Sequence, residues 1–323
     1  MAGKRGQVRV QREKAHHRFI DNPFVLRLYP FVILTVLGIV IYSNSFNCSF
    51  HFDDLSNIEN NESIRTIHNL KAIWNFSYHS KMRFLGYLTF ALDYHFHENS
   101  FFGYHLVNLG IHITASFLVW WMVVLILSTP AMRDRDIGIH KKLAALGCAL
   151  IFLSHPVQTQ AVTYIVQRFA SLASMLYLLS LCLYLKARMI PDYLFGDNYP
   201  PVKRESRGGK AVLFFCLAAV SALAGFFAKE IVLTLPLAVL LFEFGFIRPS
   251  KPGGCALLSP INYSGMNPKS LSFPRSSPGL TGGRGTAIFI LIGFVIPAIL
   301  LYRSVIETGF KPVFTAQHTT RRG

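Results

Sequence analysis

Long runs of apolar residues constrain this chain more than any other feature of its sequence. A helix needs about 20 mostly apolar residues to cross a bilayer. Hydrophobic residues make up 52% of the 323 residues, and charged residues make up only 15%. We therefore predict an all-α polytopic membrane protein with about seven transmembrane helices. The expected helices cover residues 24–43, 105–127, 143–154, 169–185, 211–228, 231–246 and 286–302.

The positions of these runs divide the chain into four parts. About 23 mostly polar residues precede the first run and no small-residue cleavage site follows it, so we expect a retained helix and not a removed signal peptide. The third run is short, and its helix is expected to continue to about Gln160. The four parts are a basic cytoplasmic tail (1–23), a membrane core (24–247) with a long first outer loop (44–104), a flexible cytoplasmic loop rich in Pro, Gly and Ser (248–285), and a last membrane helix with a truncated tail (286–323).

The net charge of +16 is distributed unevenly along the chain. Of the 32 Lys and Arg residues, 22 lie in residues 1–29 or in the loops after the second, fourth and sixth predicted helices. These segments fall on one side of the membrane, which the positive-inside rule assigns to the cytoplasm. The charge is thus a topology signal, and no nucleic-acid-binding motif accompanies it. We expect a cytoplasmic N-terminus and no nucleic-acid partner.

The first outer loop contains two apolar pieces of its own. Residues 63–76 have an amphipathic pattern, which predicts a segment lying along the membrane surface. Residues 84–94 are apolar but too short to span a bilayer.

Polar residues gather on the outer side of this layout. Ionisable residues at membrane depth are costly and usually serve a function. The stretch FHFDD after the first helix holds Asp53 and Asp54, and Arg83 precedes the apolar piece at 84–94. The other candidates lie at the outer ends of later helices: His105, Asn108 and His112 on one helix face, His155, Gln158, Gln160, Tyr164 and Arg168 in one turn, and Lys229 and Glu230 in another. Their convergence on one face is what a site requires.

Each group also has a structural explanation. The acidic pair could be part of a solvated loop, and the His- and Asn-bearing helix face could be a hydrogen-bonded seam between helices. Arg168 could extend to lipid headgroups or bind a phosphate bidentately. Lys229 and Glu230 could pair with each other at the end of a helical hairpin.

The acidic stretch could instead bind a divalent metal. His51, Asp53 and Asp54 are weak candidates to hold it, because three adjacent residues without a fourth partner at helical spacing make a poor metal site. The five cysteines add no metal-binding spacing. A divalent metal is therefore a candidate cofactor that the sequence does not place.

Five blocks of the sequence follow one another as they do in a known family. They are FHFDD, RFLGYLTFALDYHF, GYHLVNLGIHI, HPVQTQAVTYIVQRFASLASMLYLLSL and KEIVLTLPLAVLLFEF. Over about residues 24–247 they resemble the membrane domain of bacterial tetratricopeptide-repeat membrane proteins. That domain is related to the eukaryotic transmembrane O-mannosyltransferases that carry such repeats, and to the wider GT-C class of lipid-linked glycosyltransferases. The resemblance implies a GT-C-like fold.

The resemblance also implies an activity. Such a protein would transfer a sugar from a polyprenyl-phosphate donor to a protein or glycan hydroxyl, with inversion, on the non-cytoplasmic face of a bacterial cytoplasmic membrane. The family's paired acids map onto Asp53 and Asp54, one of which would be the general base. The donor phosphate would be bound by Arg83, Arg168 and Lys229. Supporting roles would fall to His105, Asn108, His155, Gln160, Tyr164 and Glu230.

The chain departs from the family pattern in two places. Gln160 stands where the family often has Glu, which weakens a role for that carboxylate. The chain ends at TAQHTTRRG without tetratricopeptide repeats, so a truncated homologue is expected. Two other functions stay open: a non-catalytic membrane anchor or assembly protein, and a transporter, which would carry ionisable residues at mid-membrane and repeated halves.

Overall fold

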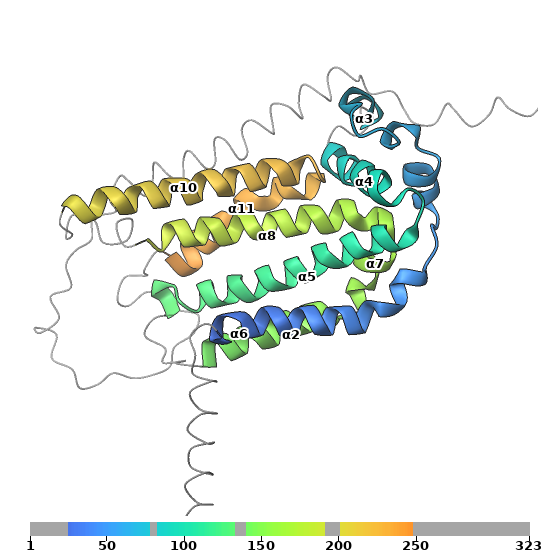
Figure 1. Ribbon diagram of the computed structural model, residues 1–323. Helices are drawn as coiled ribbons and strands as arrows, with labels where there is room; N and C mark the ends of the chain where they lie inside the picture. The colour runs from blue at the N-terminus through green and yellow to red at the C-terminus, as the bar shows by residue number, and fades with distance from the viewer. Residues whose placement is uncertain (1–24, 78–82, 133–139, 191–200, 248–323) are drawn as a thin grey trace, which may run out of the picture.

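A bundle of helices forms most of the molecule. The computed structural model describes residues 25–77, 83–132, 140–190 and 201–247, and these contain no strand. The long helices run alongside one another (Figure 1). They are α2 (Val25–Tyr42), α5 (Phe101–Ile126), α6 (His140–Ser154), α8 (Arg168–Arg188), α10 (Pro201–Phe226) and α11 (Leu235–Phe242).

Short helices close one end of this bundle (Figure 1). We call this end the polar cap; it comprises residues 43–77, 83–100, 155–167 and 227–234. Its elements are η1 (Ser43–Asn47), η2 (Leu55–Glu59), η3 (Glu62–Ile64), α3 (Leu70–Phe76), α4 (Phe84–His97), η6 (Pro156–Gln158), α7 (Thr159–Thr163), η7 (Ile165–Gln167) and η9 (Glu230–Thr234). The shorter elements η5 (Pro130–Met132) and η10 (Glu243–Ile247) follow α5 and α11 at the opposite end.

Five helical segments are long and apolar enough to cross a membrane, which confirms an all-α polytopic membrane protein. They are Leu28–Asn47, Phe101–Ile126, Ile165–Arg188, Gly209–Phe226 and Glu230–Ile247. The expected third helix corresponds to α6, whose 15 residues span about 22 Å at 1.5 Å per residue, less than a hydrocarbon core of about 30 Å. The expected seventh helix lies outside the described residues, so the total of seven stays a prediction.

One expected helix is shorter in the structure. The helix after residue 143 was expected to continue to about Gln160, but α6 ends at Ser154. His155 has an extended backbone and Pro156 follows it; proline has no N–H to donate and disfavours a helical residue before it. The amphipathic piece at 63–76 contains the end of η3 and all of α3, with Asn69 accepting a hydrogen bond from Ala72 N at 3.0 Å at the start of α3; its position along the membrane surface stays a prediction.

Helix α8 lies between α5 and α10 and packs against both (Figure 1). Small buried residues on α10, including Ala218 and Ala222, line the contact, and Ser180 Oγ donates to Ala218 O at 2.9 Å. Small side chains let helix backbones approach closely, and in a bilayer this van der Waals packing drives helix association. The position of α8 is therefore fixed along its length, which matters for the polar groups at its two ends.

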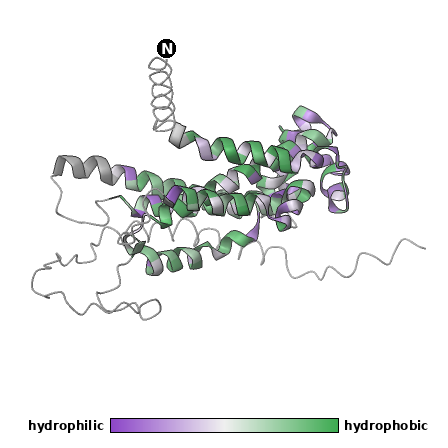
Figure 2. Ribbon diagram, turned by 90° about the horizontal axis from the view of Figure 1, so that it is seen from below, coloured by the Kyte–Doolittle hydropathy of each residue, from purple (hydrophilic) through white to green (hydrophobic). Residues whose placement is uncertain are grey.

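The surface of the bundle and the surface of the polar cap differ in polarity. Large apolar side chains remain exposed on α2, α10 and α11, for example Val40, Val220 and Leu241. Figure 2 shows apolar residues along the bundle and hydrophilic residues gathered at the polar cap. Lipid can solvate the apolar sides of the helices, whereas the polar cap carries backbone and side-chain groups that need partners.

Candidate functional site

The acid loop (residues 48–54) follows η1 and turns sharply before η2. Asp54 N donates to His51 O at 2.9 Å and Leu55 N donates to Phe52 O at 3.2 Å. This turn places Phe52 at a φ of 47°, a region that residues other than glycine rarely occupy. The two acids consequently differ in environment, since Asp53 is exposed and Asp54 is only 1% exposed.

Asp54 joins the acid loop to the turn before α8. Its Oδ1 accepts a hydrogen bond from Val166 N at 2.7 Å, and its Oδ2 accepts one from His51 N at 3.2 Å. Burial raises the pKa of Asp54, while the backbone hydrogen bonds from His51 and Val166 and the nearby His105 oppose that shift. The Asp54 side chain thus acts as a structural bridge between the two segments.

Asp53 is exposed, and its backbone is held by several hydrogen bonds. Its N–H donates to the Tyr164 hydroxyl at 3.2 Å, and its carbonyl accepts from Asn57 Nδ2 at 2.7 Å and from Ser56 Oγ at 3.2 Å. Burial raises the pKa of the Tyr164 hydroxyl, and the carboxylates of Asp53 and Asp54 add to the rise. Of the two acids, Asp53 is the one that can meet a substrate.

Arg168 is fully buried and makes hydrogen bonds to α4 and α5. Its Nη1 donates to Asp93 Oδ2, its Nε donates to Asn108 Oδ1 at 2.6 Å, and its Nη2 donates to Tyr104 O at 2.8 Å. The expected contact of Arg168 with lipid headgroups or a donor phosphate has no exposed surface on which to occur. We therefore assign this side chain a role inside the protein.

The polar face of α5 forms a hydrogen-bonded seam, one of the two alternatives that the sequence left open. His105 places its Nδ1 3.2 Å from Val162 O and its Nε2 3.0 Å from Cys48 O. Asn108 Nδ2 donates to Ile165 O at 3.3 Å, and His112 Nε2 lies 3.0 Å from Leu153 O. All three polar side chains are buried, so they fix neighbouring segments and do not face a ligand from solvent.

The other predicted residues lie at the surface of the polar cap or near it. His155 is exposed, and its Nδ1 accepts from Val157 N at 3.2 Å at the start of η6; Gln160 is also exposed. Glu230 is exposed and Lys229 is half-buried in the turn between α10 and η9.

Arg83 and Lys229 come to one corner of the polar cap. Leu85 N donates to Phe227 O at 2.9 Å, which ties the start of α4 to the turn after α10. Arg83 and Lys229 are each two residues from this hydrogen bond. The Arg83 guanidinium lies 5.3 Å from the centre of the Phe169 ring, and its Nε is buried without a hydrogen-bond partner among the described residues.

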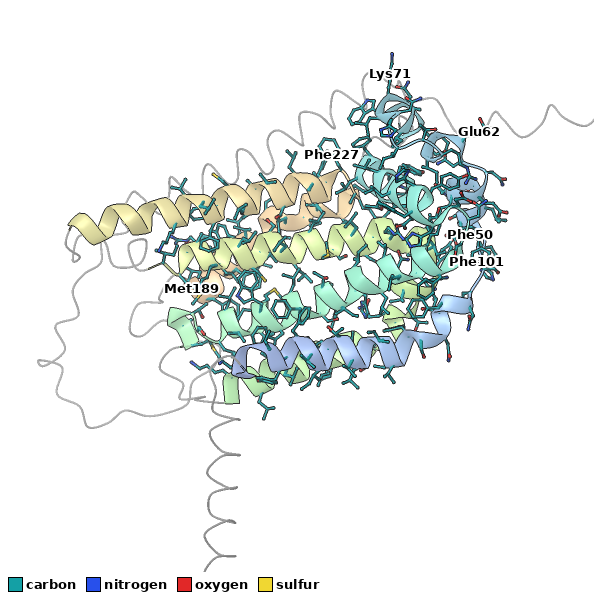
Figure 3. All side chains as sticks on the ribbon, viewed as in Figure 1. Phe50, Glu62, Lys71, Phe101, Met189 and Phe227 are labelled. Atoms are coloured by element: carbon teal, nitrogen blue, oxygen red, sulfur yellow. The ribbon has the colours of Figure 1, made fainter. Side chains whose placement is uncertain are left out.

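The packing around this polar cap is aromatic. Phe50 packs edge-to-face against Phe101 with ring centroids 4.8 Å apart and against Tyr104 at 5.5 Å. Figure 3 shows Phe50 and Phe101 side by side at this end, whereas Met189, next to Arg188, lies at the other end of the bundle. These edge-to-face contacts hold the acid loop against the start of α5.

Asp93 is a residue that the sequence interpretation missed. It is 5% exposed on α4, and its partner Arg168 comes from the start of α8. The available signal was a lone acid in an apolar run, which is costly unless it is paired.

The candidate metal ligands do not form a cluster. Among the described residues, no group of three or more His, Cys, Asp or Glu side chains is placed to hold a metal ion. The His51 ring is turned toward Ser49 O at 2.5 Å, and Asp54 is occupied by backbone N–H groups. The set His51, Asp53 and Asp54 therefore gains no support as a metal site.

Fold and site together define a multi-pass membrane protein with a two-acid loop fixed at one end of its helix bundle. No protein-family model matches the chain, and no solved structure matches it significantly. The chain is similar to curated proteins named protein O-mannosyl-transferases. It is 29% identical to Tmtc3 of Drosophila melanogaster over 245 residues, which are 70% of this chain and 25% of that protein. It is 30% identical to TMTC4 of Homo sapiens over 178 residues, which are 50% of this chain and 24% of that protein.

A third relative, TMTC3 of Mus musculus, is 30% identical over 157 residues, which are 46% of this chain and 16% of that protein. The chain thus spans about a quarter or less of the length of these curated relatives. The similarity supports the expected likeness to transmembrane O-mannosyltransferases. The expectations of a bacterial origin and of a missing repeat region stay predictions.

Proposed function

We propose that the chain forms the membrane part of a glycosyltransferase that moves a mannosyl group from a polyprenyl-phosphate donor to a protein hydroxyl. One observation carries the proposal: Asp53 is exposed at the polar cap, while its neighbour Asp54 is buried and fixes the loop from within. The relatives are named protein O-mannosyl-transferases, which supports the sugar and the class of acceptor. The polyprenyl-phosphate donor rests on the sequence resemblance.

In the proposed step, Asp53 is the general base. The acceptor oxygen attacks the anomeric carbon and its proton passes to a carboxylate oxygen of Asp53. The bond between the anomeric carbon and the phosphate oxygen breaks, and the electron pair leaves with the phosphate. The products are the glycosylated acceptor and polyprenyl phosphate. A single displacement inverts the anomeric configuration and needs no covalent enzyme intermediate.

The departing phosphate needs positive charge nearby as the bond breaks. Arg83 and Lys229 are the residues that we assign to it, because each lies two residues from the Leu85–Phe227 hydrogen bond at one corner of the polar cap and neither side chain is fully buried. Arg168 is left out of this role because its guanidinium is enclosed and each of its nitrogens already has a protein partner.

We assign the polar cap to the non-cytoplasmic face and the N-terminus to the cytoplasm. The support is the uneven charge, since the basic loops join helix ends opposite to the polar cap. The reported relatives are animal proteins, so the proposal specifies the membrane face and not a bacterial inner membrane.

Transport is disfavoured by the positions of the buried charges in the described part of the chain. The Arg168–Asp93 and Arg188–Glu243 pairs lie at the two ends of α8 and not at its middle, whereas transporters bind substrates near the bilayer midplane. A non-catalytic anchor would not transfer sugar, so an assay of sugar transfer distinguishes it from a transferase.

The test is transfer by the purified full chain in lipid nanodiscs, with radiolabelled polyprenyl-phosphate mannose and a Ser/Thr-rich peptide. We expect label in the peptide with the native chain and, with Asp53→Asn, labelling that is slower by about 100-fold or more. Binding of the donor without transfer would favour the anchor, and neither binding nor transfer would refute the proposed activity for this chain.

A further inference from the structure

Two helices that are distant in sequence meet in a buried ion pair inside the polar cap. Asp93 lies on α4 and Arg168 begins α8, and the Arg168 Nη1 donates to Asp93 Oδ2. The guanidinium carbon also lies 4.6 Å from the centre of the Phe90 ring. Both charged groups are nearly or fully enclosed by protein, so a ligand arriving from solvent reaches neither of them.

A continuous path of hydrogen bonds leads from this pair to the acid loop. Arg168 Nε donates to Asn108 Oδ1 at 2.6 Å, and Asn108 Nδ2 donates to Ile165 O at 3.3 Å. Val166 N donates to Asp54 Oδ1 at 2.7 Å. The Ile165 carbonyl and the Val166 N–H belong to one planar peptide unit, so a bond that orients the first also orients the second.

The chemistry of the pair favours geometric control over stabilisation. Burying two charges costs desolvation free energy that offsets much of their attraction, so a buried ion pair is weak evidence for stability. A guanidinium, however, is planar and presents its N–H groups in fixed directions. The Asp93 carboxylate therefore sets the plane of Arg168, and that plane sets where Nε meets Asn108.

We propose that Asp93 and Arg168 are positioning residues: they orient the 165–166 peptide, and through it hold the acid loop where Asp53 is presented to the acceptor. The catalytic consequence rests on the proposed transferase function. The mechanical coupling between the ion pair and the acid loop does not, and it can be measured on a protein that shows no activity.

A matched control lies at the other end of the same helix. Arg188 is about 30 Å from Arg168 along α8 at 1.5 Å per residue. Arg188 Nε donates to Glu243 Oε2 at 3.0 Å and Nη2 donates to Oε1 at 2.5 Å. This pair is also buried and also joins α8 to another segment, but the described contacts give it no path to the acid loop.

The first measurement is hydrogen exchange by mass spectrometry on the full chain in nanodiscs. With Asp93→Asn we expect exchange in peptides covering 164–167 and 51–56 to accelerate about tenfold, and with Glu243→Gln we expect these peptides to exchange as in the native chain. Unchanged exchange in Asp93→Asn, or an equal acceleration in Glu243→Gln, would overturn the coupling.

The second measurement is the transfer reaction. Misplacement of a catalytic group by about 1 Å can cost about 100-fold in rate. We therefore expect Asp93→Asn to lower kcat by about 10- to 100-fold, with little change in KM. Asp93→Glu should recover part of the loss, and Glu243→Gln should keep the native kcat. A native kcat in an Asp93→Asn protein with accelerated exchange would overturn the catalytic role.

If the Asp93 variants fail to insert into the membrane, Arg168→Lys replaces them. Lysine keeps the positive charge but lacks the several N–H donors of the planar guanidinium. Arg168→Lys should accelerate exchange at 164–167 as Asp93→Asn does, and native exchange in this variant counts against the coupling. If the native chain transfers no sugar at all, the proposed function fails, and the exchange data still decide whether the ion pair holds the acid loop.

Discussion

The Asp54 carboxylate accepts a hydrogen bond from the backbone N–H of Val166 at 2.7 Å, across 112 residues of sequence. A second carboxylate oxygen of Asp54 accepts from His51 N within the acid loop. One side chain thus holds both the internal turn of the loop and its attachment to the segment before α8. The adjacent Asp53 shares the loop but none of this burial, and the two acids should therefore respond differently to the same substitution.

Replacing each acid with Asn separates catalysis from structure. Asp53→Asn should slow sugar transfer by about 100-fold or more, as for loss of a general base. Its free energy of unfolding should stay within about 0.5 kcal/mol of native, as for most surface changes. Asp54→Asn should unfold more readily by about 1–3 kcal/mol, because its NH₂ group would face one of the two backbone N–H donors. Transfer assays and thermal unfolding in nanodiscs measure both effects.

The two variants are compared for which of them loses transfer and which of them loses stability. If Asp54→Asn lost transfer at native stability while Asp53→Asn kept it, the roles assigned to the two acids would be reversed. Equal transfer by both variants at the native rate would remove the acid loop from the mechanism.

The raised pKa of Asp54 predicts a pH dependence of stability. Burial favours the protonated carboxyl group in the folded protein, so this group binds its proton more tightly folded than unfolded. Its contribution to stability is fully present below the ordinary aspartate pKa and is lost as pH rises through the higher folded-state pKa. Native protein should lose stability relative to Asp54→Asn over that window. Tm measured for both proteins from pH 3 to about 7 tests the sign; a gap that does not change with pH would contradict it.

Part of this architecture was predictable because it depends on local properties of the chain. The length of an apolar run decides whether a helix can span a bilayer, and five segments in the described residues meet that condition. The end of α6 at Ser154 is also a local matter, because Pro156 disfavours a helical residue before it and so opposes a helix that continues to Gln160.

The arrangement of the polar residues was less predictable because it depends on contacts between distant segments. Adjacent residues Asp53 and Asp54 have the same side chain, and their different burial follows from the turn at Phe52 and from Val166. The sequence position of Arg168 is compatible with binding a phosphate, but in the structure its guanidinium donates to Asp93. An acid in an apolar run indicates that a partner exists, but not which one.

The backbone at Phe52 offers a test of the loop geometry. Its φ of 47° is unfavourable for any side chain, and its ring is 85% exposed. Glycine accepts this φ without steric cost, so Phe52→Gly should be more stable than Phe52→Ala by about 1 kcal/mol. Both variants lose the ring, which leaves backbone strain as the difference in thermal unfolding. Equal stability of the two variants would mean that Phe52 does not hold a positive φ.

The contact between α4 and α8 is tested at Gly86. A Cβ added there would overlap the Phe169 ring, which is buried and packed against Tyr87 and Phe90. Because an aromatic ring cannot bend away, Gly86→Ala should destabilise the protein by about 1–3 kcal/mol, as overpacking does. Gly110→Ala on α5 is the matched change, since nothing lies within 4 Å of its added Cβ, and it should be neutral or stabilising by up to about 1 kcal/mol. Thermal unfolding of both variants tests this contact. Equal stabilities would show that α4 does not pack on Phe169 at this distance. The placement of Asp93, which lies on α4, opposite Arg168 would then lose its support.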